Sequence, residues 1–114
     1  MPAPWPSATL KLTPKRARVG DALQLTLTLA SAAARKQPLL IDYALHRVLA
    51  NGSTAPKVFK GWRLELGGGD TVQLTKRHSL REVTTRRAYP GRHRIEILIN
   101  GRAAAQADFD LRLD

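Results

Sequence analysis

The stretch ALQLTLTLA, residues 22–30, decides the fold class of this chain. Leu23, Leu25, Leu27 and Leu29 alternate with glutamine and threonine. Because successive side chains of a β-strand point to opposite faces, this pattern predicts a strand with a buried leucine face and a polar face in solvent. A period of two residues also dominates the rest of the sequence.

The same alternation continues on both sides of this stretch, in short segments that turn residues separate. We expect seven strands, at about residues 10–13, 23–29, 38–49, 58–66, 72–80, 95–99 and 103–113. Gly61 interrupts the fourth of these strands, and residues 30–37 form a loop. Short strands separated by turns are typical of an all-β protein rather than an α/β fold. The sequence therefore predicts an immunoglobulin/fibronectin-like antiparallel β-sandwich of about seven strands.

The length of 114 residues corresponds to one domain. Residues 1–7, which contain three prolines, are expected to be a flexible leader or linker stub, and residues 8–114 a single β-sandwich domain. Cysteine is absent, which excludes disulfides, thiolate metal sites and thiol nucleophiles. That absence is compatible with the cytoplasm, where we expect the protein. No apolar run approaches the roughly 18 residues of a membrane helix, so we expect no membrane partner.

The last hairpin permits a prediction of its register. A two-residue turn at Asn100-Gly101 would place apolar residues of one strand opposite the wrong face of the other. A three-residue loop, Ile99 to Gly101, restores the phase and pairs Ile97 with Ala103. The further pairs in this register are Ile95 with Ala105, His93 with Ala107, Arg94 with Gln106 and Arg92 with Asp108. We favour the three-residue loop.

The sequence contains no catalytic constellation. His46, His78 and His93 stand alone, and the last two share the phase of the apolar residues of their strands, which favours half-buried structural histidines over metal ligands. His78 and Ser79 cannot act as base and nucleophile, because adjacent strand residues point to opposite faces. The glycines at 67–69 lack the Lys-Ser/Thr ending of a phosphate loop. We expect no enzyme activity, no cofactor and no metal.

The chain is strongly basic, because nineteen lysines and arginines against nine acids give a formal net charge of +10 at pH 7. This balance favours polyanionic partners such as DNA. The alternative is a well-solvated basic surface, and composition leaves both open. Asp108 and Asp110 share one strand face, and we expect them to be solvent-side partners of arginines.

The segment 76–94 concentrates the positive charge, with seven cations and a single acid, Glu82. Its arginines at 81, 86 and 87 lie in the expected loop between the fifth and sixth strands, where the sequence offers them no obvious acidic partner. Threonine hydroxyls beside them could add neutral hydrogen bonds to phosphate oxygens. The predicted nucleic-acid-binding residues are Lys76, Arg77, Arg81, Thr84, Thr85, Arg86 and Arg87.

Two further features qualify this prediction. Lys57, Lys60 and Arg63 would extend the basic patch, with Trp62 as a stacking surface for a base. The neighbours of Trp62 have core spacing, however, which favours a tryptophan packed inside the domain. In the last hairpin, Arg92 and Arg94 have a structural alternative, which is to pair with acids across the hairpin.

Several segments carry a resemblance to a known family: Lys57 to Lys60, His78 to Leu80, Thr84 to Arg87, Tyr89 to His93, and Asn100-Gly101. From about Val19 to the end, the chain resembles the C-terminal β-sandwich of bacterial DNA alkylation repair proteins built on HEAT-like helical repeats, the alkylpurine DNA glycosylase group.

The resemblance implies a non-catalytic accessory domain that aids DNA contact, with an upstream helical-repeat domain as a partner. The catalytic helical body of that group has no counterpart in this sequence, so no catalytic residue is carried over. The alternative is a protein-interaction or spacer module that does not bind nucleic acid.

A wider similarity to fibronectin- and immunoglobulin-type domains rests on residues 91–95. Many such domains have a tyrosine where His93 stands, and its hydroxyl bonds to the backbone upstream in a tyrosine corner. Here either His93 or Tyr89 could supply that hydrogen bond, and the sequence leaves the choice open.

Overall fold

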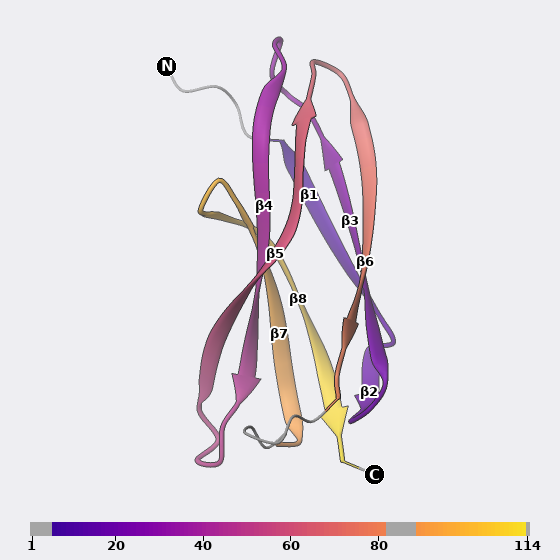
Figure 1. Cartoon of the computed structure of the whole chain (residues 1–114), viewed down its shortest axis with the longest axis vertical. Coiled ribbons are helices and arrows are strands. Elements are labelled where there is room, and N and C mark those ends of the chain that lie inside the picture. The colour runs from indigo at the N-terminus through magenta and orange to yellow at the C-terminus, as the bar shows by residue number, and fades with distance from the viewer. Residues whose placement is uncertain (1–5, 82–88, 114) are drawn as a thin grey trace.

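Two β-sheets pack face to face, and their long strands run roughly along the long axis of the molecule (Figure 1). The computed structural model describes residues 6–81 and 89–113. The three-stranded sheet has the order β1-β3-β6, and the five-stranded sheet has the order β2-β8-β7-β4-β5. The strands are β1 (Ser7–Thr13), β2 (Arg16–Arg18), β3 (Ala22–Ala30), β4 (Gln37–Val48), β5 (Thr54–Leu66), β6 (Thr71–Ser79), β7 (Gly91–Ile99) and β8 (Arg102–Arg112). This arrangement confirms the predicted immunoglobulin-like β-sandwich.

The described residues contain eight strands rather than seven, and their pairing is antiparallel except between β2 and β8. No helix among them is long and apolar enough to cross a membrane. Ser7, which the sequence assigned to the leader, already pairs with Ala30 in the first strand.

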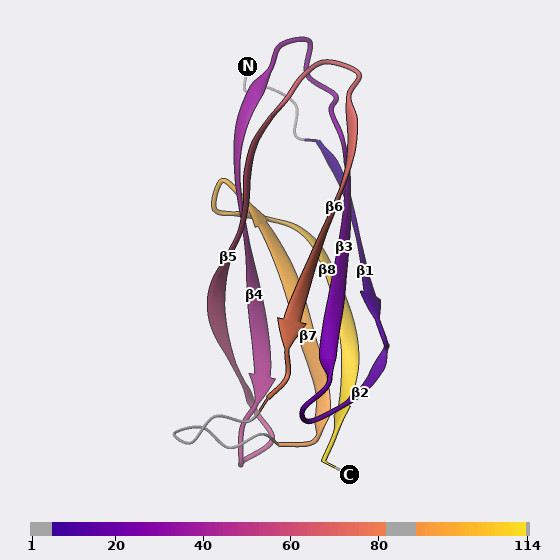
Figure 2. The same cartoon turned by 45° about the vertical axis from the view of Figure 1, so that its right-hand side comes forward.

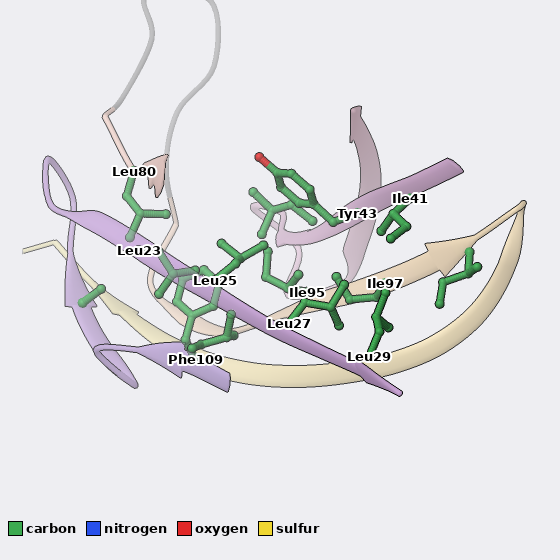
Figure 3. Close-up of a cluster of buried hydrophobic side chains, with 14 of the residues drawn as sticks. Leu23, Leu25, Leu27, Leu29, Ile41, Tyr43, Leu80, Ile95, Ile97 and Phe109 are labelled. Atoms are coloured by element: carbon green, nitrogen blue, oxygen red, sulfur yellow. The ribbon is translucent and has the colours of Figure 1, made fainter. Parts of the chain in front are cut away.

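The core forms where the alternating faces of the two sheets meet (Figure 3). The four leucines of β3 are completely buried. Opposite them lie Ile95 and Ile97 of β7 and the half-polar Tyr43 of β4, all at most 3% exposed. Because β3, β7 and β4 are central strands, only their inner residues can be covered from every side. The alternation predicted from residues 22–30 therefore marks the centre of the core.

The short strand β2 was missed in the sequence, because three residues are too few to display a period. After the cis peptide bond between Thr13 and Pro14, the chain leaves the three-stranded sheet and joins the five-stranded one. Ala17 of β2 is 1% exposed, and the Asp110 amide donates a hydrogen bond to the Lys15 carbonyl at 2.8 Å. One continuous segment thereby ties the two sheets together.

The interruption expected at Gly61 is a β-bulge in β5. Ile41 pairs with Trp62, whereas the next residue of β4, Asp42, pairs with Lys60, so Gly61 is the extra residue. A Cβ atom at this position would stand 2.6 Å from the Ile41 carbonyl oxygen. Only glycine lets the two backbones approach this closely. β5 also begins earlier than expected, and its Pro56 is tolerated because β5 is an edge strand.

The predicted register of the last hairpin is wrong. Ile99 pairs with Arg102, so Asn100-Gly101 form a two-residue turn with φ values of 49° and 84°. A bulge in β8, at Ala104, restores the phase that we had assigned to a longer loop. The observed pairs are Ile97 with Ala105, Ile95 with Ala107, His93 with Phe109, Arg94 with Asp108 and Arg92 with Asp110.

The neighbouring strand β4 explains the choice of turn. The backbone amide of Asn100 donates to the Leu40 carbonyl at 2.8 Å, and the Asn100 side-chain oxygen accepts from the Leu40 amide at 2.8 Å. Asn100 therefore acts as an additional pairing position for β4. A contact between residues 60 positions apart fixes this turn, which the sequence of the hairpin alone does not reveal.

Candidate nucleic-acid interface

One end of the sandwich gathers the β2–β3 turn, the end of β6 and the end of β8 (Figures 1 and 2). Backbone hydrogen bonds join these segments: Val19 donates to the Arg112 carbonyl at 3.0 Å, and Gly20 donates to the Leu80 carbonyl at 3.2 Å. The Leu80 amide returns a bond to the Asp21 carbonyl at 2.8 Å. Three segments that are distant in the sequence are thereby held side by side.

Each of these three segments carries an exposed arginine: Arg18 at the end of β2, Arg81 just after β6, and Arg112 at the end of β8. We call these three residues the basic end. Arg18 and Arg112 are direct partners in the parallel pairing of β2 with β8, so both project from the same face of that sheet. Like charges placed directly opposite each other on neighbouring strands destabilise a sheet. A bound anion would relieve that repulsion.

The Asp21 carboxylate, in the β2–β3 turn, forms no ion pair with the arginines of the basic end. One side-chain oxygen of Asp21 accepts a hydrogen bond from the backbone amide of Arg18 at 2.9 Å, which stabilises the turn. Two other described arginines form ion pairs elsewhere, between β7 and β8: Arg92 with Asp110 and Arg94 with Asp108. None of the described carboxylates pairs with an arginine of the basic end.

Of the seven predicted site residues, the structure describes three. Arg81 is exposed, and its backbone amide bonds to the Ser79 hydroxyl at 3.2 Å. Lys76 and Arg77 lie on opposite faces of β6: Lys76 faces the other sheet, and Arg77 faces solvent. The structure therefore does not bring Lys76 and Arg77 together. Outside the described residues lie the other four: Thr84, Thr85, Arg86 and Arg87.

Arg77 lies at the rim of the basic end. It shares a cross-strand row with Gln24 and Thr13 on the outer face of the three-stranded sheet. A shallow depression of about 310 Å³ opens there, and its lining residues are Thr13, Pro14, Asp21, Ala22, Gln24 and Arg77. Arginine, amide and hydroxyl groups are the donors that commonly contact phosphate oxygens. Arg77 therefore extends the basic end onto this face.

The sequence missed Arg18 and Arg112 as candidates, because they meet only through the parallel pairing of β2 with β8. No local spacing relates two residues that are so far apart in the chain. The expectation that Asp108 and Asp110 pair with arginines is confirmed, although the predicted register placed Asp108 opposite Arg92 and placed no arginine opposite Asp110. Arg94 meets Asp108 at 2.9 Å, and Arg92 meets Asp110 at 3.9 Å.

His78 and His93 lie on the inner faces of their strands, as the alternation predicted. The His78 ring packs edge-on against Phe59, and its Nδ1 lies 2.9 Å from the Tyr43 hydroxyl. Burial lowers the pKa of His78 and raises the pKa of Tyr43. Ser79 faces the opposite side of β6 from His78, as the alternation predicted. The described residues contain no group of three or more side chains that could hold a metal ion.

His93 supplies the corner hydrogen bond that the sequence left open. Its Nε2 donates to the Tyr89 carbonyl oxygen at 3.0 Å, and its ring stacks on Phe109. The side chain is 4% exposed. Burial lowers the pKa of His93, and the positive charge of Arg47 lowers it further, whereas the bond to Tyr89 opposes the shift. A histidine thus replaces the tyrosine of the usual corner.

Residues 7–113 match the model of a family described as the C-terminal Ig-like domain of the uncharacterised protein YhaZ. The chain belongs to this family. It is 32% identical over 102 residues to YhaZ of Bacillus subtilis (strain 168), an alignment that covers 90% of this chain and 28% of that protein.

Parts of two solved structures are similar to this chain. The chain is similar to part of the Pseudomonas fluorescens alkylpurine DNA glycosylase AlkC bound to DNA containing an abasic site analog. The TM-score is 0.90 and the identity 37%, over 94% of this chain and 30% of that one. A β-glucosidase from Listeria innocua matches with a TM-score of 0.73 at 15% identity, over 95% of this chain and 16% of that one, which shows the fold alone. The chain thus spans less than a third of YhaZ and of AlkC.

Proposed function

We propose that this domain is a non-catalytic accessory part of a DNA alkylation repair protein and that its basic end contacts the DNA backbone. The observation that carries the proposal is the pairing of Arg18 with Arg112, with Arg81 on the adjoining segment and no described carboxylate paired to them. The similarity to AlkC supports it, because that protein was solved with DNA. A helical-repeat domain upstream is the partner that the same similarity suggests.

The chemistry of the basic end suits phosphates better than bases. Arginines fixed at the ends of strands can make charge-assisted bonds to phosphate oxygens, whereas reading a base sequence needs an element that enters a groove. Sequence-tolerant binding that weakens steeply with salt follows, because each neutralised phosphate releases counterions. An accessory domain that steadies a repair protein on damaged DNA needs only such contacts.

The test is a fluorescence anisotropy titration of a duplex of about 20 base pairs at about 50 and 200 mM salt. Changing Arg18, Arg81 and Arg112 together to glutamine should weaken binding and reduce the slope of log K against log salt by about two to three, at about 0.9 per lost phosphate contact. A matched control changes Arg35, Lys36 and Arg63, which lie outside the basic end, to glutamine and removes the same charge.

Two results would overturn the proposal. One is the absence of duplex binding by the wild-type domain at the lower salt concentration, which favours the spacer or protein-interaction alternative. The other is an equal loss of binding in the control variant, which would reduce the effect to net charge. A second variant, Arg86→Gln with Arg87→Gln, measures in the same titration whether these two predicted residues, which lie outside the described residues, contribute to DNA binding.

A further inference from the structure

At the edge of the sandwich formed by β5 and β6, two lysine side chains contact aromatic rings. The ammonium group of Lys76, on β6, lies 5.9 Å from the ring centre of Trp62, on β5. On the same inner face of β5, the ammonium group of Lys57 lies 5.4 Å from the ring centre of Phe59. We call these four residues the lysine–aromatic seam. Its two rings are partly buried and pack against the edge of the core.

Lysine is a poor choice for packing at this place. The inward-facing residues of β6 run Val72, Leu74, Lys76 and His78, so a lysine interrupts the apolar face. Its Nζ donates to the Gly61 carbonyl at a long 3.3 Å. A lysine can cover a ring with its stem while its charge stays in water. This property explains how the fold tolerates a lysine at position 76. An aliphatic residue at position 57 or 76 would nevertheless bury more apolar area.

The charges of β5 and β6 are also unequal, although Asp42 of β4 lies opposite Lys60 of β5. The two strands carry five cations and one acid, Glu65. Those cations are Lys57, Lys60, Arg63, Lys76 and Arg77. The ion pairs of Arg92 with Asp110 and of Arg94 with Asp108 lie between β7 and β8, and neither includes a cation of β5 or β6. A surface of this charge attracts a polyanion.

The combination of rings and ammonium groups selects the kind of polyanion. Aromatic rings interleaved with cations are the elements with which proteins bind single strands, because bases stack on the rings and phosphates pair with the cations. In a duplex the base faces are already stacked on one another. The carboxylates of an acidic peptide would pair with the lysines but would not stack on the rings. A phosphate that draws Lys76 or Lys57 aside would open a ring face to a base.

We propose that the lysine–aromatic seam binds unpaired nucleotides. It lies between β5 and β6, on the inner faces of two edge strands, whereas the basic end lies at strand termini. The two surfaces use different residues. The seam therefore does not depend on the proposed duplex contact, and either can fail without the other.

The experiment uses Trp62 as its own reporter. The chain has two tryptophans, so Trp5→Phe leaves Trp62 as the only one. Titration with oligothymidine of about twelve nucleotides, within the site sizes of single-strand binders, should quench the Trp62 fluorescence as a base stacks on it. A duplex of about 20 base pairs and an oligoglutamate of similar charge should not produce this quenching.

Variants then separate stacking from charge. Trp62→Leu keeps an apolar side chain and should lower oligothymidine affinity about tenfold in anisotropy, whereas Trp62→Phe should retain most of it. Lys57→Gln and Lys76→Gln should each weaken binding more than the charge-matched Arg63→Gln, which lies on the outer face of β5. The Arg18, Arg81 and Arg112 triple variant should still show the quenching.

Three outcomes would overturn the inference. The first is unchanged Trp62 fluorescence at saturating oligothymidine. The second is equal oligothymidine affinity of Trp62→Leu and wild type. The third is equal quenching by the duplex or by oligoglutamate, which would make the seam a general anion surface. Thermal unfolding of each variant distinguishes lost binding from lost fold, and Trp62→Phe keeps the test decisive if Trp62→Leu unfolds.

Discussion

The two sides of this sandwich are closed in different ways. The chain crosses between the sheets on both sides, but on the side of β1 and β8 the crossing segment is secured by backbone hydrogen bonds from β2 and its neighbours to β8. Between β5 and β6 the described residues show no backbone hydrogen bond except within their connecting turn, where Asp70 donates to Gly67. Side-chain contacts, such as Lys76 with Gly61 and His78 with Tyr43, hold that side instead.

The difference shows where a binding surface can arise at little cost to folding. Leu12 and Ala17, on the β1–β8 side, are at most 2% exposed, so their chemistry is fixed by the core. Phe59 and Trp62, on the β5–β6 side, are only partly covered. Where side chains hold the two sheets together, a ligand can replace a lysine–ring contact without breaking a backbone hydrogen bond. Where backbone hydrogen bonds hold them, it cannot. Both proposed surfaces consist of residues that are not fully buried in the core.

The largest expected effect comes from a matched pair of leucines. Leu12 of β1 and Leu74 of β6 flank the same central strand, opposite Leu25 and Leu27, but only Leu12 is fully buried. Leu12→Ala should lower the free energy of unfolding by about 3 kcal/mol and Leu74→Ala by about half as much, because the half-exposed site leaves a smaller cavity. Urea unfolding of both variants checks this. Equal losses would refute the comparison.

A smaller effect is expected at the bulge of β5. Gly61→Ala should cost about 1 to 3 kcal/mol, because the added Cβ would press on the Ile41 carbonyl oxygen and force the strands apart. The neighbouring outward residue provides the control, since Lys60→Ala should stay within about 0.5 kcal/mol of wild type. If Gly61→Ala were as stable as wild type, the edge would be looser than the close backbone approach indicates.

The smallest expected effect is on pH dependence. Burial lowers the pKa values of His78 and His93 in the folded protein, so the unfolded chain binds more protons below its own histidine pKa of about 6.5. The free energy of unfolding should therefore be highest at neutral pH. It should fall as the pH drops below about 6.5, by at most about 1.4 kcal/mol per pH unit for each histidine.

Glutamine substitutions at His78 and His93 show how much each histidine contributes to this pH dependence. His78→Gln removes the contribution of the β5–β6 side, and His93→Gln removes that of the corner at Tyr89, where the amide can keep the donor. Urea unfolding from pH 7 to 5 should show a flatter profile for each variant. A slope that neither substitution changes would show that other groups cause the pH dependence.

Much of the fold followed from local sequence, and the candidate site did not. The phase of His78 and His93 was predicted correctly, because alternation alone decides which face of a strand a residue occupies. The predicted site residues Lys76 and Arg77 lie on opposite faces of β6 for the same reason. The hairpin register was wrong, because Leu40 of β4 selects the Asn100-Gly101 turn from outside the hairpin.

The sequence by itself determined the class of fold, the leucine face of β3 and the absence of cysteine chemistry, because each is a property of neighbouring residues or of composition. Only the tertiary structure decided that Arg18 meets Arg112 and that Lys76 lies over Trp62. These contacts join segments far apart in the chain, and no local pattern carries that information. Strand alternation is encoded by neighbours, whereas a surface is assembled by the packing of two sheets.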